Sequence, residues 1–589
     1  MTLSNLDWSI IGIYFLFVLA VGLWVSRQSR SSVADYFLSG RNMSWWLLGV
    51  SMVATTFSAD TPNLVTDLVR QKGVAGNWGW WAFLLTGMLT VFVYAKLWRR
   101  SQVLTDIEFY ELRYSGKPAA FLRGFRALYL GLVFNVLVMG AVSLAAIKFG
   151  EIVLGWEGWK TLLIAGSITL AYSTFGGLKA VIITDFVQFI LAMIGSIWAC
   201  IYILNLPEVG SLDALLTHEN VADKISILPN LDDPAIWIPV LLVPLAVQWW
   251  ASYYPGAEPG GGGYIAQRMF SAKDEKNAIG ATLLFNAAHY ALRPWPWILI
   301  ALASLVVFPE LSDIQEVFPA LSEDKLGHDV AYPAMLTKLP SGLLGLVAAS
   351  LIAAFMSTMS TQLNLGASYL VNDFYQRFIN PEADQKTLVR MGQLFTLVSA
   401  MLGLGLGLVL TDATQAFNLL LLLGAGTGMI YILRWFWWRI NAVTEIFAMI
   451  LSLVIAIFFT YVDHGLEDWQ TLIWGAGLTT AGWIAATFFT RPTDYETLKK
   501  FYTSIRPSGS GWNGFLQAAR EKGDAIEQAP GGLALSILCF VIGTVTVYAT
   551  LFAVGNFLYG NLPEAGLLGG IAAVGTGFLF YAWGKINQT

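Results

Sequence analysis

The stretch FSADTPNL, residues 57–64, decides the fold of this chain. It places Asp60 and Pro62 inside an apolar run, 45–68, that is long enough to cross a bilayer. A second apolar run, 236–255, ends in SYYPGAEPGGGGY, residues 252–264. Proline and glycine interrupt helices, and freed backbone at membrane depth is tolerated only beside a cavity or buried protein. The sequence therefore predicts two broken membrane helices.

The composition is that of a membrane protein. Of 589 residues, 56% are hydrophobic and only 12% are charged, whereas a soluble domain carries about a quarter. Fifteen apolar runs have roughly the length of a membrane helix, so we expect an all-α polytopic protein with about fifteen spans. The four histidines are scattered, no nucleophile–base pair stands out, and Cys200 and Cys539 lie in apolar runs as expected of buried thiols. These features argue against an enzyme and against a resident metal centre.

Charge asymmetry predicts the orientation. The first run, 8–26, follows Asp7 and precedes Arg27 and Arg30, which is the reverse of a signal peptide. With the N-terminus outside and alternating spans, most of the 34 Lys and Arg residues fall on the cytoplasmic side. The seven outer ones are Arg70, Lys72, Lys148, Lys160, Lys224, Lys325 and Lys338. We expect a multi-pass protein of the plasma (inner) membrane with a cytoplasmic C-terminus.

The two breaks lie five spans apart, which indicates a transporter built from inverted repeats. The predicted division is an N-terminal extra helix and cytoplasmic loop (1–44), a first repeat (45–204), an extracellular loop (205–235) and a second repeat (236–440). Additional helices follow in 441–589, with a cytoplasmic loop at 491–530 that contains an amphipathic segment. Five spans in each half place the halves in opposite orientations.

Hydroxyl side chains are crowded into AAFMSTMSTQLNLG, residues 353–366. Ala354, Ser357, Thr358 and Thr361 share one helical stripe, and Ser360 lies beside it. Hydroxyl oxygens suit Na⁺ better than a transition metal, and a nearby carboxylate would supply the negative charge. Helix packing is the alternative, because Ser and Thr in membrane helices bond back to the preceding turn.

Two carboxylates, Asp60 and Asp185, fall within apolar runs, where an ionisable group indicates function. Asp185 lies near a predicted cytoplasmic end, and there its alternative role is that of a solvated residue at a helix start.

Several motifs together resemble the sodium:solute symporter family. They are DYFLSGRNMSWW (35–46), YSTFGGLKA (172–180), TDFVQ (184–188), YIAQRMFSAK (264–273) and AAFMSTMSTQLN itself. They occur in the family's order over roughly 1–440. The resemblance implies a LeuT-type fold with five-plus-five inverted repeats, and Na⁺-driven uptake of a small organic solute by alternating access.

The resemblance also implies two sodium sites. The main one would use the carbonyls of Ser58, Thr61 and Ala354 with the side chains of Ser357 and Thr358. The second, which some members such as sialic acid transporters have, would use Asp185, Ser357, Ser360 and Thr361. One or two Na⁺ per cycle are therefore expected.

The expected solute site is less sharply defined. Asp60 matches a position that is Asp in proline-type and Asn in galactose-type members, and Tyr254 matches an inner-gate tyrosine. The segment between Tyr254 and YIAQR is longer than the resemblance implies, and Val65 stands where sugar transporters have Gln. His289 and Arg293 stand near the place of a substrate-binding lysine, and Trp250 is one of several nearby aromatics. Arg293 either binds a solute or pairs with a buried acid, or extends to the membrane surface.

A sugar-like solute is favoured over a carboxylate-bearing one such as an amino acid or sugar acid. A transporter-like membrane sensor is the alternative outside transport. The expected partners are the solute, Na⁺ and the lipid bilayer, with no nucleic acid, and the expected functional unit is a monomer.

Overall fold

The computed structural model describes residues 3–26, 32–56, 58–319, 321, 323–410, 427–529 and 531–586. Within these residues the chain is helical, apart from loops and one isolated parallel bridge between Met43 and Ala272. The α-helices up to Thr217 are α1 (Asn5–Ser26), α2 (Val33–Leu38), α3 (Trp45–Thr56), α4 (Asp60–Lys72), α5 (Trp78–Trp81), α6 (Leu84–Leu89), α7 (Ala95–Ser101), α8 (Phe109–Arg113), α9 (Gly116–Leu128), α10 (Asn135–Phe149), α11 (Gly158–Leu204) and α12 (Leu212–Thr217).

The second half has its own set of helices. These are α13 (Pro234–Trp237), α14 (Trp249–Ala251), α15 (Gly263–Ser271), α16 (Glu275–Ala287), α17 (Pro294–Val307), α18 (Leu311–Val317), α19 (Ala331–Leu336), α20 (Leu343–Ser368), α21 (Gln385–Gly407) and α23 (Gly428–Leu433). The C-terminal region has α24 (Ala442–Tyr461), α25 (Asp468–Phe489), α26 (Tyr495–Ile505), α27 (Asn513–Glu521), α28 (Leu533–Leu558) and α29 (Leu562–Ile586). Short π-helical stretches such as Ala288–Leu292 (η8) join several α-helices into longer spans.

Twelve helical segments in the described residues are long and apolar enough to cross a membrane, so a multi-pass protein is confirmed and the count of fifteen is not. Of the other three expected spans, 45–68 is divided by the break between α3 and α4. The run 160–175 forms the shorter first part of α11, which changes direction at Gly177, where φ is 58°. The run 413–438 lies largely outside the described residues.

Both predicted breaks are present. The helix that begins at Trp45 ends at Thr56, and a new helix begins at Asp60. In the second half, α14 ends at Ala251 and α15 begins only at Gly263. The intervening loop is ordered by buried side chains, because Asp106 accepts from the Gly263 N–H at 2.9 Å. The indole of Trp98 donates to the Gly260 carbonyl at 2.8 Å.

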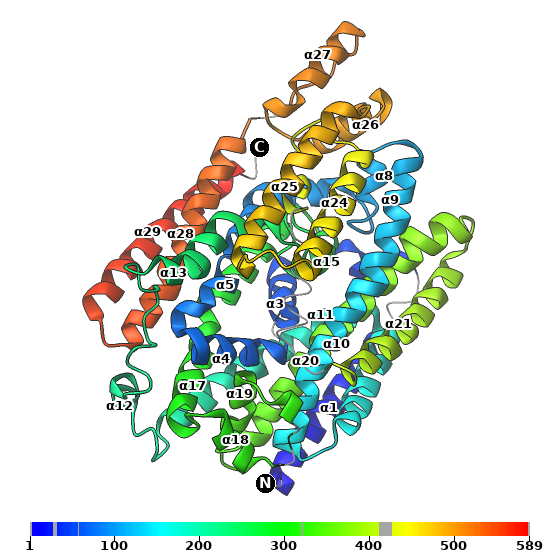
Figure 1. Cartoon of the computed structure of the whole chain (residues 1–589). Helices are drawn as coiled ribbons and strands as arrows, with labels where there is room; N and C mark the ends of the chain where they lie inside the picture. Colours follow the sequence, from blue (N-terminus) through cyan, green and yellow to red (C-terminus); the bar gives the residue numbers. More distant parts are fainter. Residues whose placement is uncertain are drawn as a thin grey trace.

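Helix α20 carries the hydroxyl stripe through the centre of the bundle, where it packs against α1, α3, α10, α11 and α21 (Figure 1). Its N-terminus is held by α1, because Asp7 Oδ1 accepts from the N–H groups of Gly342 and Gly345, each at 2.7 Å. A helix N-terminus has unpaired donors, which a carboxylate satisfies. Gly345 is required here, because a Cβ atom at this position would lie 2.5 Å from the Asp7 backbone.

Polar contacts on the predicted outer side join loops to helices. The outer lysines Lys148, Lys325 and Lys338 pair with Asp329, Glu151 and Glu208, respectively.

Helices α18 and α19 lie at the end of the bundle where the chain begins, and α26 and α27 lie at the opposite end (Figure 1). The predicted amphipathic segment of 491–530 forms α26, which buries its apolar face. Cys200 and Cys539 are buried and free, as predicted.

Candidate functional site

The break between α3 and α4 frees backbone carbonyls that other helices then use. The last four carbonyls of an α-helix have no partner within the helix, and in α3 these belong to residues 53–56. Arg293 donates through Nη1 to the Val53 carbonyl at 2.8 Å. Thr358 on α20 donates through Oγ1 to the Thr55 carbonyl at 2.7 Å. The hydroxyl stripe therefore meets the end of α3.

The carbonyls expected to bind sodium lie a few residues further along the chain. The Ser58 carbonyl accepts from the Thr61 N–H at 3.2 Å, so it belongs to the first turn of α4. The Thr61 hydroxyl turns back to the Thr56 carbonyl at 3.3 Å. The contact of Thr55 with α20 was not foreseen from the sequence. The signal for it was available, because the carbonyls freed by a break are those that precede it.

The hydroxyls of α20 divide into two kinds. Ser360 donates to the carbonyl of Ser357 at 2.9 Å, which is the back-bonding expected of a packing residue. The Ser357 side chain instead donates to Asp185 Oδ1 on α11 at 2.6 Å. The hydroxyl oxygen of Thr361 lies 3.0 Å from that of Thr55 on α3. Three of the four hydroxyls thus join α20 to other elements.

Ala354 lies on the same face of α20, one turn before Ser357 and Thr358, and is buried with them. Its carbonyl is therefore on the stripe that faces the end of α3. The structure brings the α20 members of the expected main site together. The backbone opposite Thr358 belongs to residues 53–56 and not to residues 58–61.

The residues of the expected second site surround a buried ion pair. Asp185 is fully buried and also accepts from Ser51 at 2.6 Å. The guanidinium of Arg268, on α15, lies 3.6 Å from the Asp185 carboxylate and donates to Thr361 at 2.7 Å. Sequence reasoning missed Arg268, although an arginine that follows a broken helix at membrane depth requires a partner.

A small cavity of about 50 Å³ lies beside the break. This volume is smaller than the roughly 300–1,000 Å³ that is common for small-molecule sites. Four of the residues expected to bind Na⁺ or the solute line it, namely Asp60, Thr61, Tyr254 and His289. The other lining residues are Thr56, Leu64, Val65, Trp80, Phe83, Pro255, Gly256, Ala257, Phe285 and Tyr290.

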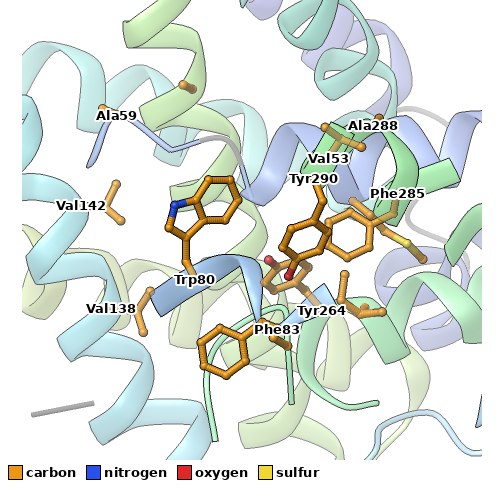
Figure 2. Close-up of a cluster of buried hydrophobic side chains, with 14 of the residues drawn as sticks. Val53, Ala59, Trp80, Phe83, Val138, Val142, Tyr264, Phe285, Ala288 and Tyr290 are labelled. Atoms are coloured by element: carbon orange, nitrogen blue, oxygen red, sulfur yellow. The ribbon is translucent and has the colours of Figure 1, made fainter. Parts of the chain in front are cut away.

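The cavity has an aromatic wall. Trp80, Phe83, Phe285 and Tyr290 belong to the cluster of buried side chains in Figure 2, and all four line the cavity. The Trp80 and Tyr290 rings stack with centroids 5.8 Å apart. Phe83 stacks on Tyr254 with centroids 5.2 Å apart, so Tyr254 holds its ring against the cavity wall. Such a wall offers flat apolar surfaces to a solute.

Two polar atoms in the cavity wall lack partners. Asp60 Oδ1 and His289 Nδ1 are buried and have no hydrogen-bond partner among the described residues. Leaving a buried polar atom unpaired costs about 1–3 kcal/mol, and more for a charged group. Unpaired polar atoms that share a cavity wall require an explanation, and a ligand with complementary polar atoms would supply one.

Two other expected solute contacts are placed elsewhere. Arg293 and Trp250 are not among the described residues that line the cavity. Arg293 is buried, donates to the end of α3 and lies over the Trp297 ring. The indole of Trp250 donates to the Ala246 carbonyl of its own helical segment. Arg293 thus contacts the backbone at the end of α3, and its charge also interacts with the buried Asp60 carboxylate, as one alternative from the sequence expected.

Comparison with known proteins agrees with this arrangement. The profile of the sodium:solute symporter family matches residues 36–452. The chain is 25% identical to a sodium/glucose cotransporter of Vibrio parahaemolyticus over 80% of this chain and 88% of the relative. It is 27% identical to the sodium/mannose cotransporter SLC5A10 of Bos taurus, over 67% of this chain and 68% of the relative.

A solved structure of a Na⁺-coupled sialic acid symporter superimposes with a TM-score of 0.66 at 19% identity, covering 83% of this chain and 99% of that one. This likeness establishes the LeuT-type fold that the sequence predicts. Because the family profile matches most of the chain, the protein belongs to the sodium:solute symporter family, whose members are Na⁺-coupled secondary transporters rather than enzymes.

Proposed function

We propose that this protein imports a sugar-like solute, a hexose or a polyol, together with Na⁺. The observation that carries this proposal is the cavity beside the break, in which an aromatic wall faces the unpaired Asp60 and His289 atoms. Sugars have apolar C–H faces and a rim of hydroxyls, and they match a wall of this kind. Relatives named for glucose, mannose and myo-inositol transport support the same class.

The polar atoms of the cavity favour hydroxyls over a carboxylate. A sugar hydroxyl donates to the Asp60 carboxylate and either donates to or accepts from His289, according to the imidazole tautomer. A carboxylate-bearing solute would face the negative charge of Asp60. The cation that would attract it, Arg293, is directed to the Val53 carbonyl. The carboxylate alternative therefore has less support.

The main sodium site, we infer, lies between the end of α3 and the stripe of Ala354, Ser357 and Thr358 on α20. In this placement the carbonyls of residues 53–56 replace those of Ser58 and Thr61, which the family resemblance implies. The contact of Thr358 with Thr55 supports this placement, because it already brings oxygens of both helices together. Na⁺ at this point would hold α3 against α20 and order the break beside Asp60.

Coupling follows from this geometry. A Na⁺ ion that stabilises the ordered break raises the population of the conformation in which the cavity wall is complete. The solute then binds more tightly, and by linkage it raises the affinity for Na⁺ by the same factor. A negative potential inside the cell favours entry of the positively charged ion.

The remaining organisation is proposed as the sequence predicts it. The N-terminus lies outside and the C-terminus in the cytoplasm of the inner membrane, and residues 45–204 and 236–440 form the inverted repeats. The protein works in the bilayer as a monomer, with 441–589 packed outside the repeats. The number of Na⁺ ions, one or two per cycle, depends on the cluster around Asp185.

Thermal stability of the purified protein tests the function. The melting temperature is measured in Na⁺, K⁺ and choline at constant ionic strength, and then with hexoses, polyols, carboxylates and cationic solutes in Na⁺. A ligand that binds the folded state raises the melting temperature by mass action. We expect a Na⁺-specific rise that hexoses or polyols enlarge.

The same solutes are then tested for Na⁺-driven uptake in proteoliposomes. A response only to carboxylates would overturn the sugar assignment. Stabilisation by a solute without any uptake would favour the membrane sensor. Thr358→Ala is the matched control, because it removes one hydroxyl of the proposed main site and leaves the cavity wall intact.

A further inference from the structure

Three small cavities follow the loop of the second break, residues 252–262, one after another. The first is the proposed solute cavity, which shares Gly256 and Ala257 with a middle cavity of about 10 Å³. The middle cavity shares Glu258 and Gly261 with an inner cavity, which is also about 10 Å³ in volume. The loop thus forms one wall of a row of cavities that leads away from the solute site.

The inner cavity lies on the predicted cytoplasmic side. Asp106 lines it and precedes α8, which packs against α26 of the predicted cytoplasmic loop (Figure 1). Arg126 and Arg434 line the same cavity, and their charges interact with the Asp106 carboxylate. A volume of about 10 Å³ holds roughly one water molecule, so the row is closed to a solute at this end.

The Asp106 carboxylate joins two helices here, one through each of its oxygens. Oδ2 accepts from the Gly263 N–H at 2.9 Å, where α15 begins after the second break. Oδ1 accepts from the Tyr369 hydroxyl at 2.6 Å, where a π-helical stretch, Tyr369–Ile379 (η11), continues α20. Both contacts are buried and charge-assisted, which makes them stronger than hydrogen bonds between neutral groups.

The start of α15 has a backbone that permits this close approach. Gly263 has a φ of 56°, and a Cβ atom there would collide with the Glu258 carboxylate. At Gly262 a Cβ atom would lie 3.2 Å from Asp106 Oδ2. Glycine at both positions therefore lets the two carboxylates lie against the first turn of α15.

We propose that Asp106 is an inner latch, whose two hydrogen bonds hold the start of α15 against the end of α20 and keep the cytoplasmic end of the cavity row closed. This inference rests on the proposed function, because the latch would release a solute that moves along the loop towards the cytoplasm. Opening requires α15 to separate from α20, and both hydrogen bonds cannot persist when it does. Asp106 is a positioning residue, since neither Asp106 nor Tyr369 is among the described residues that line the solute cavity.

Access of a thiol reagent to the inner cavity tests the proposal in the full chain. Leu130→Cys places a thiol in the cavity wall, on a background in which Cys200 and Cys539 are replaced by alanine. A membrane-impermeant maleimide is added to inside-out vesicles in Na⁺ without solute, and the rate of labelling is measured. We expect slow labelling when Asp106 is present. Asp106→Asn should label roughly tenfold faster, because its side chain has one acceptor oxygen and loses one charge-assisted hydrogen bond.

Two tyrosine variants form a matched pair. Tyr369→Phe removes only the phenol hydroxyl and breaks the same link from its other end, so it should also accelerate labelling. Tyr94→Phe removes another buried hydroxyl, which donates to the Ile432 carbonyl at 3.0 Å, and it leaves the contacts of Asp106 intact. Tyr94→Phe should label at the wild-type rate.

Wild-type labelling rates in folded Asp106→Asn and Tyr369→Phe would overturn the latch. Equal acceleration in Tyr94→Phe would also overturn it, because loosened packing would then open the cavity. If Asp106→Asn does not fold, Tyr369→Phe decides by itself. The proposed function fails differently, since a wild-type chain whose melting temperature responds to neither Na⁺ nor any solute would refute the coupled import, whatever the labelling rates of the variants.

Discussion

Replacing Arg293 by methionine tests whether this arginine supports the broken helix or binds the solute. Arg293 donates to the Val53 carbonyl at 2.8 Å and to the Thr56 carbonyl at 3.4 Å. Its side chain is 1% exposed. Methionine keeps much of the length and apolar packing over Trp297 but removes every donor. The two carbonyls at the end of α3 are then left without this partner.

The magnitude follows from those two contacts. A hydrogen bond from a charged donor contributes about 1.5–3 kcal/mol, and a buried carbonyl left unsatisfied costs about 1–3 kcal/mol. The two free-energy ranges describe the same lost hydrogen bond, so they are not added. The 3.4 Å contact with Thr56 contributes less than the 2.8 Å contact with Val53. A loss of about 2 kcal/mol corresponds to roughly 30-fold in an equilibrium constant. We therefore expect apparent Na⁺ affinity to fall by up to roughly 30-fold, with a lower melting temperature.

The assay is a Na⁺ titration of thermal stability and of uptake, with Arg293→Lys and Arg113→Met as companions. Arg293→Lys keeps one charged donor group and should give an intermediate result. Arg113 is equally buried and donates to the carbonyls of Arg434 and Trp437 away from the cavity. Arg113→Met should lower stability without changing Na⁺ affinity. If Arg293→Met keeps wild-type Na⁺ affinity and loses only solute binding, the reasoning is refuted and Arg293 contacts the solute.

Three further predictions follow from single side chains. Thr358→Ala should raise the Na⁺ concentration for half-maximal uptake at least several-fold, because it removes the hydroxyl that contacts Thr55. Thr358→Ser keeps a hydroxyl and should restore the wild-type Na⁺ dependence. Equal Na⁺ dependence in both variants would contradict the placement of the main site beside Thr358. Asp60→Asn should weaken solute binding roughly 10- to 100-fold, since a hydrogen bond to a charged acceptor contributes about 1.5–3 kcal/mol. If the solute raises the melting temperature of this variant as much as that of the wild type, Asp60 does not bind the solute. On the predicted outer side, burial, together with the charge of Arg70, lowers the pKa of His328 below its ordinary value of 6.5, and Arg70 Nε donates to the His328 ring. The unfolded chain therefore protonates His328 more readily than the folded chain does, so the stability is complete above about pH 6.5 and falls as the pH drops below that value. On acidification, the melting temperature of His328→Asn should fall less than that of the wild type. Identical pH profiles of the two proteins would contradict the assignment.

Much of the fold was predictable because it depends on neighbours in the sequence. The length of an apolar run determines whether it can cross a bilayer. Pro62 lies in the first turn of α4, where proline is tolerated, and the glycines at 260–263 lie where α15 begins, so both mark the start of a new helix after a break. Twelve of the fifteen expected spans are single apolar helices in the described residues, because length in the sequence does not show where a break or a kink divides a helix, and 413–438 lies largely outside those residues. The break in 45–68 and the turn at Gly177 are such places.

The candidate site was predictable only in part. The cost of a buried carboxylate singled out Asp60 and Asp185, and helical spacing placed Ser357 and Thr358 on one stripe. The sequence offered no way to tell which hydroxyl would bond back to its own helix, as Ser360 does. That choice depends on whether a partner from another helix lies within reach.

The sequence by itself determined the membrane class, the two broken helices, the hydroxyl stripe and the family, because each depends on composition, local geometry or motif order. Only the tertiary structure decided the partners. It placed Arg268 beside Asp185, Thr55 against Thr358, and Arg293 on the end of α3. The physical reason is that a buried charge must be paired, while the identity of its partner depends on how helices from distant parts of the chain cross.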